Sequence, residues 1–325
     1  MNLDLAIANL TSIPVLAFAF GVIASRLKTD LSVSKGAYEA ISFVLLLSIG
    51  FKGGIALHAT NFGQVGIPLG TTVLLGCLIP LLAFLVLRFV PALNRTDRGS
   101  VAAHYGSTSL VTFTAAIVFL ENAKIPYEGV VTTLLVAMEI PGLLVGILLA
   151  RGGVSALRDG ELIREVFFGK TVLLLVGGVI MGFIAGPKGY ESVKVLFVDA
   201  QPGLLTLFLL TLGIQAGQNL KHFRALGPGL GAFAVVMPVI GGVIGSAAGA
   251  AIGLSAGGAT ALAVLCASAS YIAAPAAVSI ALPTANRSTA ITASLGITFP
   301  FNLIVGLPLY FWLSSWFVDL MQLAC

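Results

Sequence analysis

Two short stretches concentrate hydroxyl side chains inside apolar segments. HYGSTSLVTFT begins at His104, and CASASYIAAP begins at Cys266. Hydroxyl oxygens can ligate a cation, and a helix N-terminus beside them can hold an anion because its backbone N–H groups lack partners within the helix. For either stretch alone, the alternative is that Ser and Thr bond to the preceding turn and allow close packing. The candidate substrate-binding residues are Ser107, Thr108, Ser109, Thr112, Ser268, Ala269, Ser270 and Tyr271.

An acidic residue, Glu139, lies in a third apolar stretch, VAMEIPGLLVG. A carboxylate at such a position is costly and usually serves as a cation ligand or proton carrier. The other interpretation is a neutral glutamic acid that is hydrogen-bonded to the backbone. A similar stretch, GITFPFNLIVG, makes Asn302 the candidate neutral counterpart. The candidate cation-binding residues are Glu139, Ser109 and Ser270.

The sequence gives weak grounds for an enzyme. GLSAG at 253–257 matches the G-x-S-x-G motif of hydrolases. However, all three histidines precede Ser255, whereas the histidine follows the serine in that fold. Glycines at every fourth position from Gly241 to Gly257 are typical of a packing ridge between helices. We expect no enzyme activity, no catalytic residues and, since the three cysteines lack metal-ligand spacing, no metal site.

The composition of the whole chain is that of a membrane protein. Hydrophobic residues make up 58% and charged residues 9%, with a mean hydropathy of +1.06, which is too little charge to cover a hydrated surface. We expect an all-α polytopic membrane protein with about ten spans of roughly 20 residues each. They fall at about 7–26, 36–57, 65–90, 99–120, 127–151, 167–187, 195–219, 225–252, 257–282 and 289–318.

The positions of Lys and Arg predict the orientation. Thirteen of the 17 follow odd-numbered spans and three follow even-numbered spans, while Lys52 lies within the second span. By the positive-inside rule, both termini face outward from a plasma (inner) membrane. The net charge of +4 is then a result of topology. Because aromatic and basic residues are not interleaved, we expect no nucleic-acid partner.

The chain contains an internal repeat. SIGFKGGIAL at 48–57 returns as TLGIQAGQNL at 211–220, with Gly50 matching Gly213 and Lys52 matching Gln215. The copies lie five spans apart, and an odd number of spans per unit inverts the second unit, as in many secondary transporters. Lys52 is interpreted either as part of a polar face or as a snorkelling lysine among packing glycines.

This repeat predicts how the chain divides. We expect a first repeat over 1–151, a short cytoplasmic linker over 152–166 and a second repeat over 167–325. The two hydroxyl-rich stretches then occupy spans four and nine, the corresponding positions of a five-plus-five inverted repeat. We expect both of these helices to be broken and to cross near the bilayer midplane.

Four stretches resemble the SbtA-type sodium-dependent bicarbonate transporter family: IGFKGGIAL, LENAKIPYE, MEIPGLLV and the segment from ALAVLCASAS through LPTAN. The resemblance implies a core domain sliding against a gate domain, Na+-coupled bicarbonate uptake and a homotrimer. It also implies a hydroxyl site at Ser109, Thr112, Ser268 and Ser270. The chain departs from the family in having Tyr271 where an Asp is usual and in the shortness of its linker at about 152–166.

The expected function is secondary active transport, with Na+-coupled uptake of bicarbonate or a closely similar small anion by alternating access. Sodium is expected as the coupling ion, with no other cofactor and with membrane lipid as the surroundings. Two alternatives remain open. One is a sodium- or proton-coupled carrier for another small carboxylate, and the other is an anion channel.

Overall fold

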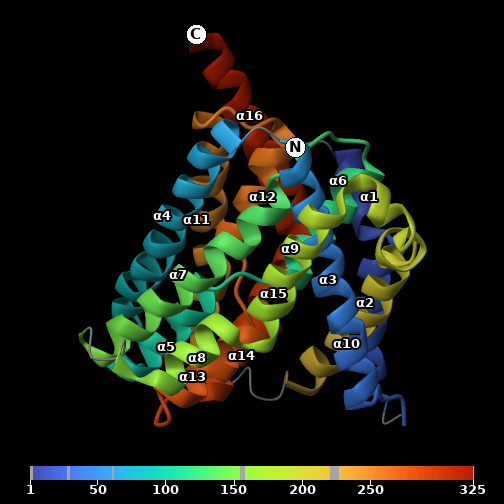
Figure 1. The fold of residues 1–325 in the computed structure, drawn as a ribbon. Helices are drawn as coiled ribbons and strands as arrows, with labels where there is room; N and C mark the ends of the chain where they lie inside the picture. Colours follow the sequence, from blue (N-terminus) through green and yellow to red (C-terminus); the bar gives the residue numbers. More distant parts are fainter. Residues whose placement is uncertain (1–2, 28–29, 61, 154–157, 220–226, 325) are drawn as a thin grey trace.

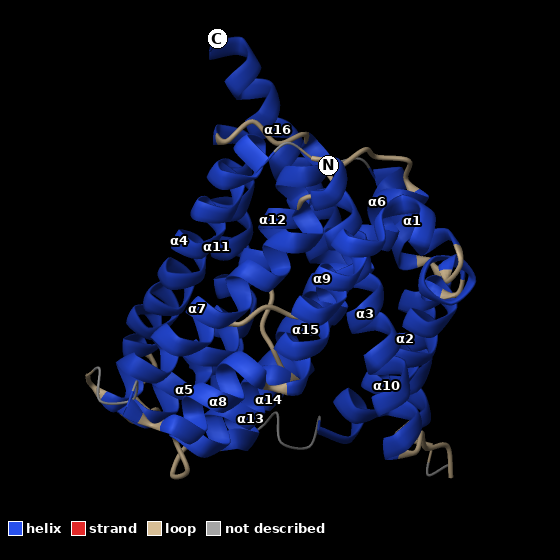
Figure 2. Cartoon of the chain, in the orientation of Figure 1, coloured by secondary structure: helices blue, strands red, loops and turns tan. Residues whose placement is uncertain are grey.

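The computed structural model describes residues 3–27, 30–60, 62–153, 158–219 and 227–324. The described chain is 84% helical and contains no strand (Figure 2), which confirms the expected all-α class. Residues 154–157 of the predicted linker, Leu220 of the second glycine-rich copy and Cys325 lie outside the described residues.

The first half of the chain forms seven α-helices and one short 3-10 helix, which together contain the predicted spans one to five. Their bounds are α1 Leu3–Leu10, α2 Ile13–Ala24, α3 Lys35–Ala59, α4 Phe62–Val86, η1 Leu87–Phe89, α5 Arg95–Gly106, α6 Leu110–Asn122 and α7 Val131–Arg151.

The second half begins with a short helix and ends in a long helical segment with π-helical turns. Its bounds are α8 Gly160–Phe168, α9 Lys170–Glu191, η3 Val195–Asp199, α10 Gln201–Asn219, α11 Gly227–Ala251, α12 Ala256–Ala267, α13 Ala273–Ala281, α14 Arg287–Ala293, η5 Ser294–Thr298, α15 Phe299–Phe301, η6 Asn302–Gly306 and α16 Leu307–Ala324.

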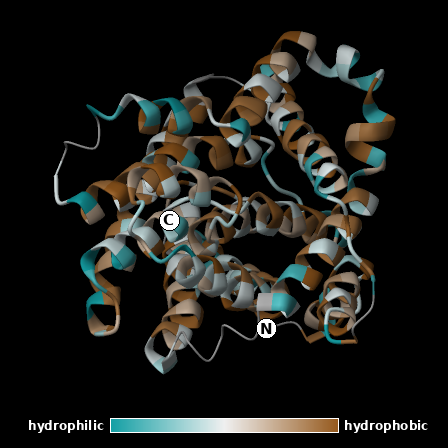
Figure 3. Cartoon of the chain, turned by 90° about the horizontal axis from the view of Figure 1, so that it is seen from below, coloured by the Kyte–Doolittle hydropathy of each residue, from teal (hydrophilic) through white to brown (hydrophobic). Residues whose placement is uncertain are grey.

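Seven helical segments among the described residues are long and apolar enough to cross a membrane, and the bent pair α1–α2 makes eight. The other two expected spans correspond to α10 and to the interrupted pair α12–α13. Seen from below, most of the helical ribbon is hydrophobic or of intermediate hydropathy, and hydrophilic residues form smaller separate patches (Figure 3). The protein is therefore a multi-pass membrane protein.

The helices form two groups. α3 packs along α9, and α2 packs along α10; we call these four helices the small bundle. α5 and α4 pack on α7, and α12 and α16 pack on α11; we call α4–α7 with α11–α16 the large bundle. Figure 1 shows the two bundles side by side, with α8 and α13 at one end and α1 and α6 at the other. We call these the α8 end and the opposite end.

Glycines allow the close helix contacts of the small bundle. A Cβ atom added to Gly50 on α3 would lie 2.8 Å from the Cα atom of Gly178 on α9. A Cβ atom added to Gly213 on α10 would lie 3.1 Å from the Cα atom of Gly21 on α2. Small residues let membrane helices approach until backbones touch. The glycines repeated in SIGFKGGIAL and TLGIQAGQNL therefore mark helix–helix contacts.

Lys52 lies in an ion pair between the bundles. Its Nζ atom is 3.2 Å from Glu121 Oε1 at the end of α6, and its side chain is 17% exposed. Tyr127 donates a hydrogen bond of 2.8 Å to the same carboxylate oxygen. The lysine that interrupts the glycine-rich stretch thus connects the small bundle to the large one, at the opposite end from α8.

Replacing Gly50 with alanine should loosen the contact between α3 and α9. The new methyl group would lie 2.7 Å from the Leu175 carbonyl oxygen, so we expect a loss of about 1–3 kcal/mol in the free energy of unfolding. Gly177→Ala is the matched control, because no atom lies within 4 Å of the added Cβ position. Thermal unfolding of purified protein in detergent compares the two, and equal midpoints would contradict this packing.

Candidate functional site

Both hydroxyl-rich stretches are helix breaks. α5 ends at Gly106 and α6 begins at Leu110, while α12 ends at Ala267 and α13 begins at Ala273. The breaks have a local cause, because short hydroxyl side chains compete with helical hydrogen bonds and stabilise a new helix start.

A serine hydroxyl accepts from the first backbone N–H groups of each new helix. The Ser109 hydroxyl accepts from the Thr112 N–H at 3.2 Å. The Ser270 hydroxyl accepts from the Ala273 N–H at 3.3 Å and from the Ala274 N–H at 3.2 Å. Ser109 is the N-cap of α6, whereas Ser270 lies two residues before Ile272, the N-cap of α13. In both cases a serine stabilises the start of the second half-helix.

The two breaks are in direct contact. The Ser109 N–H donates to the Ser268 hydroxyl at 2.9 Å. The Ser270 N–H donates to the carbonyl oxygens of His104 and Ser107, at 2.7 and 3.1 Å. The broken segments thus meet where they are non-helical, and backbone groups released by one break are satisfied by the other.

Glu139 supports the first break from α7. Its carboxylate accepts from the Ser107 hydroxyl at 2.8 Å, the Thr108 hydroxyl at 2.6 Å and the Thr108 N–H at 3.2 Å, and the residue is 2% exposed. Three donors compensate much of the cost of burying a carboxylate. The hydroxyl oxygens of Ser107 and Thr108 keep lone pairs that can ligate a cation beside it.

Asn302 supports the second break from the facing side. Its amide nitrogen donates to the Ala267 carbonyl at 2.8 Å, and its amide oxygen accepts from the Tyr310 hydroxyl at 2.7 Å. The similarity of GITFPFNLIVG to VAMEIPGLLVG within the chain indicates Asn302 but not Tyr310. The only signal for Tyr310 was its separation of eight residues from Asn302, about two helical turns.

The remaining candidate residues differ in what they offer a ligand. The Thr112 hydroxyl donates to Ser109 Oγ at 3.0 Å and so supports Ser109. Ala269 is buried and has no polar side-chain atom. Tyr271 packs against Phe299 with ring centroids 5.4 Å apart. The Tyr271 hydroxyl lies buried near the Ser109 side chain but forms no well-aligned hydrogen bond with any described residue.

A small cavity of about 10 Å³ lies beside the breaks and Glu139, where they face the small bundle. It has room for about one water-sized particle. Thr108, Ser109, Ser270 and Tyr271 line it from the large bundle, and the small bundle contributes Leu46, Thr171 and Leu175. The site therefore has walls from both bundles.

The donor set favours an alkali or alkaline-earth cation over a transition metal. Hydroxyl, carbonyl and carboxylate oxygens surround the breaks, and such oxygens are ligands for hard cations. Within the described ranges, no three His, Cys, Asp or Glu residues gather into a metal site. The N-termini of α6 and α13 add partial positive charge, which favours an anion at the same place.

A sequence model of the Na+-dependent bicarbonate transporter superfamily matches residues 14–315. The chain belongs to this superfamily. The match includes both breaks, Glu139 and Asn302, and it confirms the resemblance found in the four sequence stretches. A search of curated proteins found no match. Membership in the Na+-dependent bicarbonate transporter superfamily identifies the protein broadly as a membrane transporter with sodium and bicarbonate as the suggested solutes.

The hydrolase-like motif has a structural role in this superfamily member. Ser255 is the N-cap of α12, and its hydroxyl accepts from the Gly258 N–H at 3.2 Å. The Ser255 N–H and hydroxyl both contact the Glu128 carboxylate, at 2.7 and 3.2 Å. Glu128 thus stabilises a helix start through its negative charge.

Ser268→Ala should destabilise the contact between the breaks. It leaves the buried Ser109 N–H without its acceptor, so we expect a loss of about 1–3 kcal/mol in the free energy of unfolding. Ser294→Ala is the control: the Ser294 hydroxyl is also buried but donates only to carbonyls that already accept from the Ser294 N–H. Thermal unfolding measures both, and a Ser268 variant as stable as the Ser294 variant would contradict the assigned bond.

Proposed function

We propose that the protein is a secondary active transporter that takes up bicarbonate, or a closely similar small anion, together with Na+ by alternating access. The observation that carries this proposal is the contact between two helix breaks beside a buried carboxylate. Few arrangements in a membrane provide oxygens for a cation and helix N-termini for an anion at one point.

The anion is held by the breaks. The N-termini of α6 and α13 favour negative charge without adding a formal positive charge to the site. Ser107, Thr108, Ser109 and Thr112 of the first break, and Ser268, Ala269, Ser270 and Tyr271 of the second, form the substrate site. Polar side chains and backbone groups replace part of the anion's hydration shell.

The cation is held beside the anion by Glu139, Ser109 and Ser270. A sodium ion stripped of water needs several oxygens and is best held where a carboxylate offsets its charge. Glu139 provides that charge in a chain that has Tyr271 where the family usually has an Asp. Attraction between Na+ and the anion then couples their binding.

The proposal includes a five-plus-five inverted repeat, with units over 1–151 and 167–325 joined by a linker over 152–166. Three matched contacts support it. Gly50 meets Gly178 as Gly21 meets Gly213. The Ser109 hydroxyl accepts from the first turn of α6, as the Ser270 hydroxyl accepts from the first turn of α13. Glu139 supports the first break as Asn302 supports the second.

A fourth matched contact joins helix starts. Glu128, before α7, accepts from the Ser255 N–H at the start of α12. In the equivalent contact, Asp97 in the first turn of α5 accepts from the Asn286 N–H at the start of α14, at 2.7 Å. In the repeat, span five corresponds to span ten and span nine to span four. The contact between spans five and nine therefore has its counterpart between spans four and ten, and an acidic side chain makes both.

The two bundles supply the moving parts for alternating access. The cavity at the breaks has room for only about one water-sized particle, so binding a larger anion requires the small bundle to move relative to the large one. The Lys52–Glu121 ion pair joins the bundles in the present arrangement. We place the protein in the inner membrane as a homotrimer, with both termini outward.

A sodium- or proton-coupled carrier for another small carboxylate is the second candidate. Tyr271 favours it, because replacing an acid near the site by a neutral phenol alters both the cation ligands and the anion's surroundings. An anion channel needs a continuous aqueous path, and the small volume beside the breaks argues against one.

Glu139→Gln tests the role of the carboxylate. The substitution keeps size and much of the hydrogen bonding but removes the charge that offsets Na+, so uptake should lose its sodium dependence or fall at least about tenfold. Proteoliposomes with and without an inward Na+ gradient are assayed with labelled bicarbonate at alkaline pH, where little CO2 is present to cross the bilayer.

Tyr271→Phe is the comparison, since it removes only a hydroxyl that lacks a well-aligned hydrogen bond, and its uptake should change far less. Both variants are checked for wild-type abundance and thermal stability before assay. A Glu139→Gln protein with an unchanged sodium response would mean that coupling does not depend on this carboxylate, and protons would be tested next.

A further inference from the structure

A second cavity adjoins the one beside the breaks and extends toward the α8 end. Its volume is about 180 Å³, and its walls come from α7, α8, α9 and α13. Glu139, Thr171, Ile272 and Ala273 line both cavities. The buried carboxylate of the site therefore borders a larger space that leads away from the breaks.

This larger cavity, which we call the α8 vestibule, has a second carboxylate in its wall. Glu165 on α8 is half-buried and forms no ion pair with any described residue. Lys170 also lines the vestibule, but its ammonium group lies 4.7 Å from the centre of the Phe43 ring on α3. The negative charge of Glu165 is thus not neutralised by direct contact.

α8 is fixed in place over the vestibule. Asp159 caps its first turn by accepting from the Leu162 N–H at 3.2 Å, and it pairs with Arg151 at 3.0 Å. The Leu162 N–H and the Arg151 guanidinium hold the pKa of Asp159 below its usual range. Leu162 and Val166 are buried beneath the helix, so Glu165 is presented by an anchored segment.

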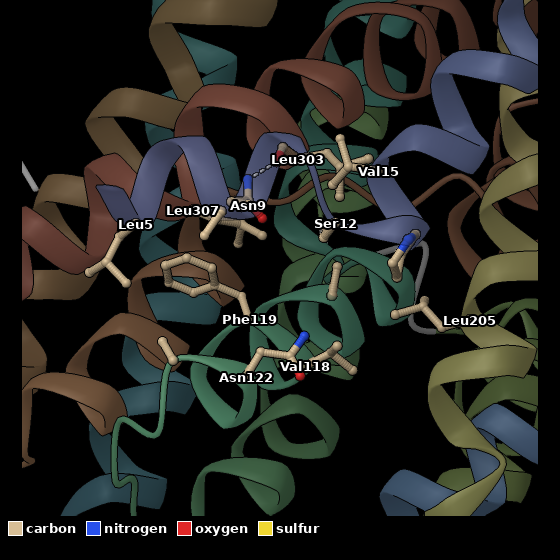
Figure 4. Close-up of a pocket in the computed structure, with 14 residues that line it drawn as sticks. Leu5, Asn9, Ser12, Val15, Val118, Phe119, Asn122, Leu205, Leu303 and Leu307 are labelled. Atoms are coloured by element: carbon tan, nitrogen blue, oxygen red, sulfur yellow. Dashed lines mark hydrogen bonds between the residues drawn. The ribbon is translucent and has the colours of Figure 1, made fainter. Parts of the chain in front are cut away.

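A similar cavity of about 190 Å³ lies near the opposite end, between α1, α2, α6 and α10 (Figure 4). Its lining is mainly apolar and includes no Asp, Glu, Lys or Arg, and none of its residues lines the cavity beside the breaks. Asn9 closes part of it by donating to the Leu303 carbonyl at 2.8 Å. This cavity is the counterpart of the α8 vestibule but is not continuous with the site.

The proposed repeat relates the two cavities residue by residue. The register that matches Gly178 with Gly21 also matches Glu165 with Ala8 and Lys170 with Ile13. Ala8 lines the apolar cavity as Glu165 lines the α8 vestibule. Of the two related cavities, only the α8 vestibule is lined by charged residues, and it is the one that borders Glu139.

We infer that the α8 vestibule is the route by which the coupling cation passes between Glu139 and the solution at the α8 end, and that the Glu165 carboxylate attracts the cation along this route. The inference rests on the proposed function. A cation leaving a buried carboxylate loses favourable interactions before it is fully hydrated, and a second carboxylate along the path reduces that cost. Glu165 also raises the local cation concentration.

Thiol labelling tests the route. In a variant whose native cysteines are replaced by alanine, Thr171→Cys should react with a membrane-impermeant methanethiosulfonate only from the side that labels Glu161→Cys, an exposed position on α8. Val118→Cys, in the apolar cavity, should not react from that side. Failure of Thr171→Cys to react from the Glu161 side, or labelling of Val118→Cys there, would overturn the route.

Transport kinetics test Glu165. In proteoliposomes with Na+ varied only on the α8 side, Glu165→Gln should raise the half-saturating Na+ concentration about threefold to tenfold while the maximal rate is kept. Glu161→Gln is the matched control: it removes a carboxylate from the same helix that does not line the vestibule, and it should stay within about twofold of wild type.

Equal half-saturation in the two glutamine variants would overturn the role of Glu165. If wild-type transport does not respond to Na+ at all, the proposed sodium coupling fails, and with it the role of Glu165 in the cation's path. The labelling experiment still decides whether the vestibule connects the site to the α8 end.

Discussion

The contact between the two helix breaks is the interaction on which the rest of the structure depends. Inside a bilayer, backbone N–H and C=O groups released by a broken helix find no water, so another part of the protein must satisfy them. Here the Ser109 N–H bonds to Ser268, and the Ser270 N–H bonds to carbonyls of the first break. Glu139 and Asn302 bond to further groups of the breaks. Because the breaks satisfy each other, polar atoms can be kept at the centre of an otherwise apolar molecule.

In the proposed alternating-access mechanism, this arrangement determines which helices move. The hydrogen bonds at the breaks lie within the large bundle, whereas the small bundle contributes mainly apolar walls, such as Leu46 and Leu175, to the cavity beside them. Sliding the small bundle therefore costs few buried hydrogen bonds. Glycine contacts such as Gly50 with Gly178 keep α3 and α9 together as one unit. The polar link at the opposite end, between Lys52 and Glu121, is partly exposed and so is weaker than a buried pair.

Local chemistry was enough to predict much of this from sequence. The hydroxyl-rich stretches predicted both breaks, because serine caps act on the next few residues. Glycine spacing indicated that α3 and α10 each pack closely against another helix. The partners of Glu139 lie more than thirty residues away, and Lys52 and Glu121 are 69 residues apart. No local pattern encodes such pairings, and the roles of Tyr310 and α8 required the packed structure.

The most direct test of the account is whether the two ions bind to one site and help each other. If Na+ lies beside the anion at the breaks, purified protein should bind bicarbonate at least about fivefold more tightly in Na+ than in K+ at equal ionic strength, and bicarbonate should tighten Na+ binding by the same factor. Isothermal titration of each ion in the presence of the other measures both affinities. Equal bicarbonate affinity in Na+ and K+ would contradict a shared site at the crossing of the two breaks.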